Sequence, residues 1–577
     1  MVTETVLNWR DNNAFQLILG GILGLAGFYY LIGSVHDFRE RRQLSQLRAK
    51  KHRERKEQFQ KLETRFPFNS NRAAIVNLSF DDLVERLQRR NLTSTEVLEA
   101  FISKALSVTN EFNCITEFIP NAIKCADELD KLPKVKGPLH GVPICVKDDH
   151  HIEGMDSTVG YAKNLYKPKN ETSVIVQVLQ NAGAVPFCKT NLPQTVFTIS
   201  SDNPIFGTTL NHLNTKLSPG GSSSGTGCLV GAGGAHFGTG SDIAGSLRIP
   251  SHFSGISTLR PTIGRMSGRG ITQCLEECAG YIGVSGIMAS KAKTLANIYE
   301  ILLTDAIQNK MDPLTLPIPW NSKLFHSTEP LRIGYFTSLP YFPTMGDTPE
   351  TILKAKDALE SIGHTVVPFE LPNSFDIIEV YTALADADGG NQNYKKLRND
   401  AVSFVAQKYM EGRSILGFLS QKLSSIFVRR SVRNFKGNVA AQRSEVLWEY
   451  LNRQRAIKHD VLDRMKKLNL DLILAPAFPY PASTIEDTET LINGCVYTCT
   501  WNLVDFPAGI TPFGTETCTK IDSYDDQGDF YLKLAKKGIK LANGMPIGVQ
   551  VVGKPHHEEQ VLRILAELEV YKSNLSR

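Results

Sequence analysis

A stretch rich in glycine and serine is the part of the sequence best suited to chemistry. Residues 218–248 read SPGGSSSGTGCLVGAGGAHFGTGSDIAGSLR, an abrupt change from the apolar patterning on either side. Glycine lets main-chain amides approach a substrate closely, and serine supplies hydroxyls that can act as nucleophiles. A flexible linker could share this composition, but it would not be interleaved with Cys228–Val230 and Ile243. We therefore expect a serine-based site in this segment.

One serine in this segment fits a common motif but lies in the wrong surroundings for it. Residues 221–225 match G-x-S-x-G, the nucleophile elbow, which requires a buried strand directly before the serine. The preceding residues 214–220 are polar and are interrupted by Pro219. The elbow interpretation therefore fails on context.

Two other patterns are better explained by local structure than by catalysis. Residues 290–293 match S-x-x-K, but no K-T-G follows, and Ser290 is interpreted as the N-cap of a helix over 291–303. The adjacent pairs His150–His151 and His556–His557 point to different faces of the chain, so we interpret them as surface residues rather than metal ligands.

Several segments in a fixed order along the chain form a longer pattern. Its centre is PGGSS at 219–223 followed by GSDIAGSLRIP at 240–250. The remaining segments are GPLHGVPICVKD at 137–148, KTN at 189–191, residues 257–270, DFPAG at 505–509 and GMPIGVQ at 544–550. This pattern resembles that of the amidase-signature hydrolases, over most of the chain. Within that family the sequence looks most like the membrane-anchored fatty-acid amide hydrolases that have a single N-terminal span.

The resemblance implies a Ser-Ser-Lys catalytic triad. Ser246 would be the nucleophile that forms an acyl ester, Ser222 the proton relay and Lys147 the base. No histidine is placed like a triad base in this pattern, and a buried lysine can lose its proton when it is desolvated. In the family, the peptide bond between Gly221 and Ser222 is cis.

The resemblance also implies how the surroundings of the nucleophile are built. An oxyanion hole is expected from the main-chain N–H groups of Ile243, Ala244, Gly245 and Ser246, each donor contributing about 3 kcal/mol. Three side chains at matching positions are expected to order the loops: Ser223, Asp242 and Arg248. Ala244 stands where glycine is common, which demands ordinary backbone angles of this residue. No metal and no cofactor is expected.

An apolar segment near the N-terminus predicts a transmembrane helix at 14–35. No acidic or basic residue occurs from Asn12 to Val35, and the run is long enough to cross about 30 Å of hydrocarbon. Trp9 and Tyr29–Tyr30 suit the two membrane interfaces. A secretory signal peptide is the competing interpretation, but the segment before the run is acidic and no clear cleavage site follows. A buried core helix is the other alternative.

The net charge of +5 is unevenly distributed. Residues 39–65 contain 11 Lys/Arg and 4 acidic residues, a local +7, and the residues before them carry −2. The rest of the chain is therefore electrically balanced, which argues against a nucleic-acid partner.

The basic segment also sets the expected orientation. The positive-inside rule places 36–66, expected to be a solvated linker helix, in the cytosol and residues 1–13 on the lumenal or exterior side. The catalytic domain, 67–577, would then lie on the cytosolic face of an endomembrane such as the endoplasmic reticulum. Ten cysteines without any C-x-x-C pair agree with reduced thiols.

A second segment, 413–435, has the pattern of a helix lying in the membrane plane. Its apolar residues follow helical spacing: Ile415, Leu416, Leu419, Leu423, Ile426 and Phe427. Basic residues accompany them, and no acidic residue occurs from Gly412 to Ser444. An ordinary amphipathic core helix is the alternative. The resemblance implies a membrane-docking cap in this part of the chain.

The spacing of apolar runs indicates an α/β fold. A helix is expected at 173–184, followed by a strand at 184–189, and further strands are expected at 331–336 and 470–475. Such alternation argues for α/β. The resemblance implies the amidase-signature fold, with a twisted mixed β-sheet surrounded by α-helices, and a homodimer.

These observations predict a membrane-bound serine hydrolase that cleaves fatty-acid amides, such as N-acylethanolamines and primary fatty amides. One alternative is another amidase, or an amidotransferase subunit, acting on small amides; the predicted span argues against the soluble amidotransferase subunit. The other is a non-catalytic lipid-binding scaffold, which would be expected to have lost part of the set Lys147, Ser222 and Ser246.

Overall fold

The core of the protein is one mixed β-sheet. The computed structural model describes residues 13–273, 275, 279–407 and 443–575. Eleven strands are hydrogen-bonded in the order β1-β3-β2-β4-β6-β5-β10-β11-β9-β7-β8. In chain order they are β1 (Ile115–Phe118), β2 (Pro143–Lys147), β3 (Val185–Thr190), β4 (Phe237–Asp242), β5 (Ser257–Arg260), β6 (Val284–Ala289), β7 (Arg332–Tyr335), β8 (Thr365–Pro368), β9 (Leu472–Pro476), β10 (Ala508–Thr515) and β11 (Pro546–Gly553).

Parallel and antiparallel pairs occupy different parts of this sheet. Strands β3, β2 and β4 run parallel, as do β9, β7 and β8. The six strands from β4 to β9 in the sheet order pair antiparallel, and β1 is antiparallel to β3 at one edge. The expected α/β fold with a mixed sheet is therefore confirmed.

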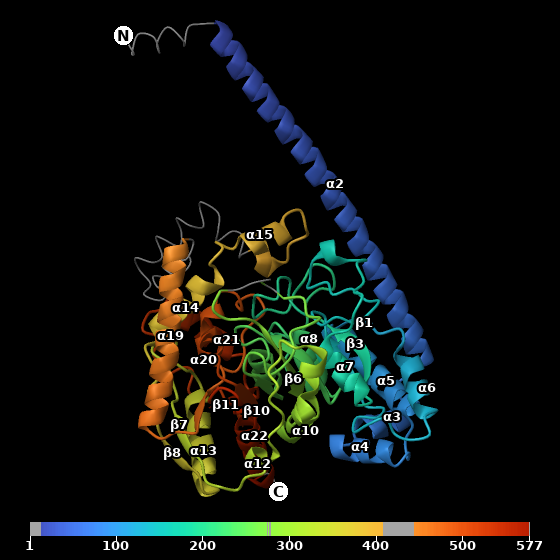
Figure 1. Ribbon diagram of the computed structural model, residues 1–577, viewed down its shortest axis with the longest axis vertical. Helices are drawn as coiled ribbons and strands as arrows, with labels where there is room; N and C mark the ends of the chain where they lie inside the picture. The colour runs from blue at the N-terminus through green and yellow to red at the C-terminus, as the bar shows by residue number, and fades with distance from the viewer. Residues whose placement is uncertain (1–12, 274, 276–278, 408–442, 576–577) are drawn as a thin grey trace.

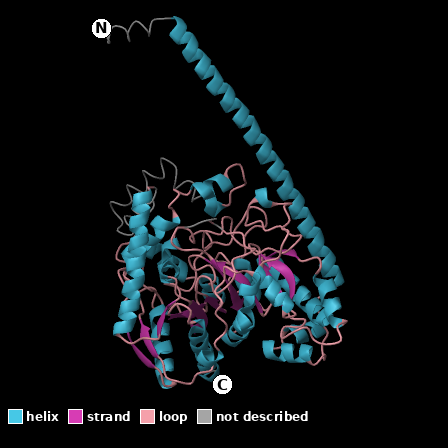
Figure 2. Cartoon of the chain, in the orientation of Figure 1, coloured by secondary structure: helices cyan, strands magenta, loops and turns pink. Residues whose placement is uncertain are grey.

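Helices surround the sheet (Figure 2). The α-helices are α2 (Asn13–Arg65), α3 (Ser70–Val76), α4 (Phe80–Gln88), α5 (Ser94–Phe112), α6 (Ala122–Asp130), α7 (Val174–Asn181), α8 (Ser224–Gly231), α9 (Arg248–Ser254), α10 (Ala292–Leu303), α11 (Ile307–Met311), α12 (Ser322–Phe325), α13 (Thr348–Ser361), α14 (Ser374–Ala385), α15 (Asn391–Leu397), α19 (Ser444–Lys467), α20 (Val496–Val504), α21 (Phe530–Ile539) and α22 (Glu558–Leu575). Short 3₁₀ helices are η1 (Ala162–Asn164), η2 (Thr304–Ala306) and η3 (Ile492–Cys495).

The sheet separates two hydrophobic cores. Successive strand residues point to opposite faces, so Leu472 and Leu474 of β9 join one core while Ile473 and Ala475 join the other. The first core includes side chains of α5, α10, α13 and α22, and the second includes side chains of α14, α19, α20 and α21. Strands β2 and β4, next to the catalytic loops, are buried along their whole length.

Most of the elements expected from apolar runs are present, with shifts at their ends. Helix α7 and strand β3 occupy the region predicted as helix then strand, and β7 and β9 match the other two predicted strands. The expected N-cap at Ser290 is wrong, because Lys291 occupies the cap position of α10. The first N–H groups of that helix, from Ala292 and Lys293, instead donate to the carboxylate of Glu569 at 3.1 and 3.2 Å.

Helix α2 runs without a break through both the predicted span and the predicted linker (Figure 1). Its N-terminal part projects away from the body of the molecule, and its C-terminal part lies beside it. No helix in the described part of the chain is long and apolar enough to cross a membrane. The span at 14–35 stays a prediction, and the predicted membrane-docking segment 413–435 lies entirely outside the described residues.

One face of the C-terminal part of α2 is docked on the body, while most of residues 36–66 are exposed as expected of a solvated helix. Lys51 is buried and pairs with Glu117 (2.6 Å) and Asp156 (3.6 Å). The side-chain amide of Gln58 donates to the carbonyl of Phe118 at 2.9 Å and its oxygen accepts the Phe118 N–H at 3.0 Å. These contacts attach the helix to the edge strand β1.

Candidate active site

Lys147 is the last residue of β2 and lies wholly inside the protein. Its main-chain N–H donates to the hydroxyl of Thr239 on the neighbouring strand β4 at 3.0 Å, which fixes the end of the strand. Its Nζ donates to Oγ of Ser222 at 2.9 Å and to Oγ of Ser241 at 2.8 Å. The structure therefore brings together two residues of the predicted triad, Lys147 and Ser222.

Ser222 lies in the tight loop before helix α8. The peptide bond between Gly221 and Ser222 is cis, as the family resemblance implies. A Cβ atom at Gly221 would lie 2.0 Å from the carbonyl oxygen of Ser200, so only glycine fits there. The close approach of these two loops explains the glycine in the PGGSS sequence.

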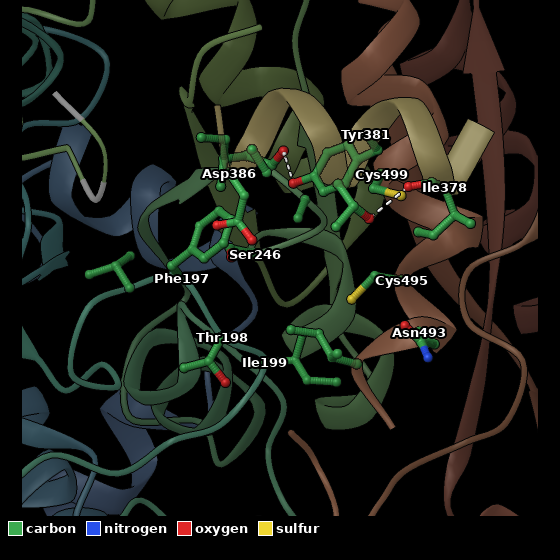
Figure 3. A pocket seen from close by; sticks show the side chains of 16 residues that line it. Phe197, Thr198, Ile199, Ser246, Ile378, Tyr381, Asp386, Asn493, Cys495 and Cys499 are labelled. Carbon is green, nitrogen blue, oxygen red and sulfur yellow. Dashed lines mark hydrogen bonds between the residues drawn. The ribbon is translucent and has the colours of Figure 1, made fainter. Parts of the chain in front are cut away.

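Ser246 lies in the loop between β4 and α9 and lines a cavity (Figure 3). The N–H of Ser223 donates to the carbonyl oxygen of Ser246 at 3.2 Å, so the loops that carry Ser222 and Ser246 are joined. The described part of the chain shows no hydrogen bond of the Ser246 hydroxyl. Direct proton transfer between Ser246 and Ser222 therefore stays a prediction. Catalytic hydrogen bonds often tighten only when substrate binds, so a missing bond does not exclude it.

Of the four main-chain N–H groups expected to form an oxyanion hole, one already has a partner within the loop. The N–H of Gly245 donates to Oδ1 of Asp242 at 2.8 Å. The N–H groups of Ile243, Ala244 and Ser246 make no hydrogen bond to described residues, and all three residues line the cavity. Ala244 is not among the residues with positive φ, so alanine is tolerated at this position.

A buried ion pair holds the nucleophile loop. Arg248 donates to both carboxylate oxygens of Asp242, from Nε and from a terminal nitrogen, at 3.0 Å each. Asp242 also accepts the N–H of Leu247 at 3.1 Å. Burial alone would raise the pKa of Asp242, but the charge and hydrogen bonds of Arg248 outweigh it and lower the pKa to about 2. The predicted loop-ordering side chains Asp242 and Arg248 are therefore found in contact.

Side chains from the C-terminal third complete this arrangement, and sequence reasoning did not assign them. The Asn502 amide donates to Oδ1 of Asp242 at 2.9 Å, and its oxygen accepts from Arg248 at 2.6 Å. Gln550 accepts from Arg248 at 3.0 Å, and Thr498 donates to the carbonyl of Ala244 at 2.6 Å. Gln550 belongs to the GMPIGVQ segment of the family pattern, so the sequence could have pointed to it. Asn502 and Thr498 lie outside every segment of that pattern.

The cavity beside Ser246 is lined mostly by apolar side chains (Figure 3). They come from the segments around Val196 and Ile243 and from α14, η3 and α20: Val196, Phe197, Ile199, Ile243, Ala244, Ile378, Tyr381, Ala385, Ile492, Cys495 and Cys499. The hydroxyl of Tyr381 donates to the carbonyl of Ile243 at 3.3 Å, which ties the cavity wall to the nucleophile loop. Such a cavity suits a hydrocarbon chain placed next to the nucleophile.

The interpretation of His150 as a surface residue is wrong. The residue is completely buried, with Nδ1 2.7 Å from Oδ1 of Asp149 and Nε2 2.6 Å from Oγ of Ser285. His151, His556 and His557 are partly exposed. The available signal was the run of acidic and histidine residues directly after Lys147, which places polar groups where β2 ends.

Within the described residues, one group of side chains is spaced closely enough for a metal ion: His36, Asp37 and Glu40 of α2. These residues are exposed or half-buried, and both carboxylates already accept from the Asn399 amide at 2.7 Å. The group therefore serves to attach α2 to the loop after α15.

The eight described cysteines are free.

The geometry is suited to acyl transfer. A serine lines an apolar cavity together with residues whose main-chain N–H groups are unused and could stabilise a developing oxyanion. A buried lysine contacts a second serine beside it.

Comparisons with known proteins agree with this chemistry. The family model described as Amidase matches residues 96–562. Fatty acid amide hydrolase 1 of Caenorhabditis elegans is 34% identical over 509 residues, covering 86% of this chain and 88% of that protein. An amidase of Gibberella moniliformis is 31% identical over 493 residues, covering 83% and 85%. The solved structure of a fatty acid amide hydrolase has the same fold, with a TM-score of 0.75 at 24% identity and coverage of 92% and 90%.

Proposed function

Because the chain belongs to the amidase family, we propose that it is a membrane-bound serine hydrolase that cleaves fatty-acid amides to a free fatty acid and an amine. N-acylethanolamines such as anandamide, and primary fatty amides, are the proposed substrates. The observation that carries this proposal is the apolar cavity that opens onto Ser246 beside the buried Lys147–Ser222 contact. The similarity to the nematode fatty acid amide hydrolase supports it.

In the proposed mechanism, Lys147 in its neutral form accepts the proton of Ser222. Ser222 takes the proton of Ser246 as the Ser246 oxygen attacks the amide carbonyl carbon. The three N–H donors of the nucleophile loop bind the oxygen of the tetrahedral intermediate. The C–N bond then breaks, the proton passes through Ser222 to the departing amine, and water hydrolyses the acyl ester.

The membrane part of the proposal rests on two sequence segments. Residues 14–35 would anchor the protein, and 413–435 would dock on the same membrane, so that a lipid substrate could enter from the bilayer. The catalytic domain would face the cytosol at an endomembrane such as the endoplasmic reticulum, and the protein would act as a homodimer. Recovery of a protein lacking residues 1–38 in the fully soluble fraction without detergent would contradict the docking segment.

A hydrolysis assay across acyl chain lengths tests the substrate class. Full-length protein in detergent is given amides of one amine with acetyl, medium-chain and long-chain acyl groups, with the Ser246→Ala variant as the blank. The proposal predicts that kcat/KM rises with chain length, because each methylene buried in the cavity contributes about 0.8 kcal/mol. A preference for the acetyl amide would instead indicate an amidase that acts on small amides.

A further inference from the structure

A buried carboxylate lies next to the candidate base Lys147, and the proposed relay does not use it. Asp149 follows β2 and is buried, with Oδ2 3.4 Å from Nζ of Lys147. Ser241 bridges the two residues, since it accepts from Lys147 at 2.8 Å and donates to the same Asp149 oxygen at 2.5 Å. Asp149 therefore contacts the base both directly and through a hydroxyl.

The other carboxylate oxygen of Asp149, Oδ1, is hydrogen-bonded to His150. Oδ1 lies 2.7 Å from Nδ1 of His150, whose Nε2 lies 2.6 Å from the hydroxyl of Ser285 on β6. A carboxylate accepts hydrogen bonds, so Nδ1 of His150 carries a proton and donates it to Asp149. A continuous polar chain thus runs from Ser285 through His150, Asp149 and Ser241 to Lys147.

The charges facing this chain come from few residues. Burial alone would raise the pKa of Asp149, but Lys147 and His150 outweigh it and hold the pKa below its usual range. The neighbouring buried charges are paired with each other: Asp148 with Lys189 at 3.1 Å on the β3 side, and Asp242 with Arg248 on the α9 side. Partly buried His151, whose pKa burial lowers to about 4, adds no charge at neutral pH.

We propose that Asp149, held by His150, is a positioning residue that sets the pH at which Lys147 becomes a base. This inference rests on the proposed function. An ionised carboxylate 3.4 Å from an ammonium group stabilises the charged lysine, whereas the relay requires the neutral amine. Asp149 therefore moves the working range of the enzyme towards alkaline pH, and it opposes the burial of Lys147, which favours the neutral amine.

The test is the pH dependence of the rate at which a fluorophosphonate probe labels the full-length protein in detergent. The wild-type rate is expected to reach half of its maximum at alkaline pH. In Asp149→Asn the midpoint is expected to fall by about 1 to 3 pH units, because an opposite charge at this distance shifts a titration by that amount. At neutral pH the fraction of active base would rise about tenfold for each unit.

Two variants separate charge from structure. Asp149→Glu keeps the charge and is expected to keep the alkaline midpoint, even where its maximal rate is lower. Asp148→Asn removes a buried aspartate that pairs with Lys189 instead, and its midpoint is expected to match that of the wild type.

The outcomes distinguish this inference from the proposed function. Labelling of Ser246→Ala at the wild-type rate would overturn the function itself. If Ser246→Ala is inert and Asp149→Asn has the wild-type midpoint, the inference alone is overturned. If Asp149→Asn does not fold, a wild-type midpoint at or below neutral pH overturns it, and an alkaline midpoint retained by Asp149→Glu supports it.

Discussion

Gly245 donates its main-chain N–H to Asp242 at 2.8 Å, three residues back along the chain. The contact turns one amide away from the cavity, and the neighbouring amides of Ala244 and Ser246 remain unused by the described residues. The Asp242 carboxylate thus orders the loop and also determines which main-chain N–H groups remain free to bind a substrate. This arrangement leads to the first prediction.

Gly245→Ala is expected to lower both stability and activity. Gly245 has φ +128°, and a Cβ atom there would lie 2.4 Å from the Thr498 hydroxyl oxygen. Strain of this kind costs about 1 to 3 kcal/mol, and a displaced loop would misplace the oxyanion donors. Thermal unfolding and probe labelling measure the two effects. Gly233→Ala is the matched control, since it also has positive φ but nothing within 4 Å of its Cβ position. Equal labelling rates for the two variants would contradict this account of the loop.

Ser246→Ala is expected to abolish labelling by a fluorophosphonate probe and amide hydrolysis, because it removes the proposed nucleophile. Ser251→Ala, in helix α9, is the control. Its buried hydroxyl has no hydrogen-bond partner among the described residues, so its loss should leave labelling near the wild-type rate. Full labelling of Ser246→Ala would rule out the assignment of the nucleophile.

Ser222→Ala is expected to reduce the labelling rate by about 10² to 10⁴, the usual contribution of positioned proton transfer. It interrupts the path between Lys147 and Ser246 without removing either residue. Ser224→Ala, whose hydroxyl bonds the carbonyl of Asn191 at 3.3 Å, is the neighbouring control. A relay role would be contradicted if both variants kept the wild-type rate.

Acid should weaken the fold partly through Asp242. Its pKa is lowered to about 2 in the folded protein, against about 3.9 in an unfolded chain, so the folded state binds fewer protons. The stability it contributes, about 2 kcal/mol, is complete above pH ~4 and is lost as the pH falls towards 2. Urea midpoints measured from pH 2 to 7 should depend less steeply on pH in Asp242→Asn than in the wild type. Parallel curves would contradict this role of Asp242.

Truncation should separate the projecting part of α2 from its docked part. Removal of residues 1–35 is expected to leave the thermal unfolding temperature of the body unchanged. Removal of residues 1–66 also removes Lys51 and leaves Glu117, whose pKa burial already raises, without its partner. A buried group left unpaired costs about 1 to 3 kcal/mol, so the longer truncation should unfold at a lower temperature. Equal unfolding temperatures would show that the docked segment contributes nothing to stability.

The resemblance located the candidate site well because its residues lie in a few contiguous segments. Lys147 contacts Ser222, and Arg248 contacts Asp242. The prediction could not say which N–H of the loop is used internally, because that depends on how the Asp242 carboxylate is oriented. Hydrogen-bond direction is a property of the folded loop and not of residue spacing.

What sequence reasoning missed arises from contacts between distant segments. Asn502 and Thr498 reach the nucleophile loop from about 250 positions away, the separations being 260 and 254 residues. Adjacent histidines point to different faces, which favours the surface for His150, yet both of its ring nitrogens have buried partners. The linker was assigned to solvent because it is highly charged, yet Lys51 finds its counter-charges on the body. Composition shows that charges are present, and only the fold shows whether they are compensated.

The attachment of Gln58 to Phe118 also bears on how copies of this protein can associate. Strand β1 ends the sheet on one side, and an uncovered edge strand is a ready template for pairing with another chain. The Gln58 amide engages both main-chain groups of Phe118 that such a neighbour would use, and Arg55 donates to the carbonyl of Ile115 on the same strand at 2.6 Å. Helix α2 therefore blocks growth of the sheet at this end, so self-association by strand addition is left to the opposite edge, at β8.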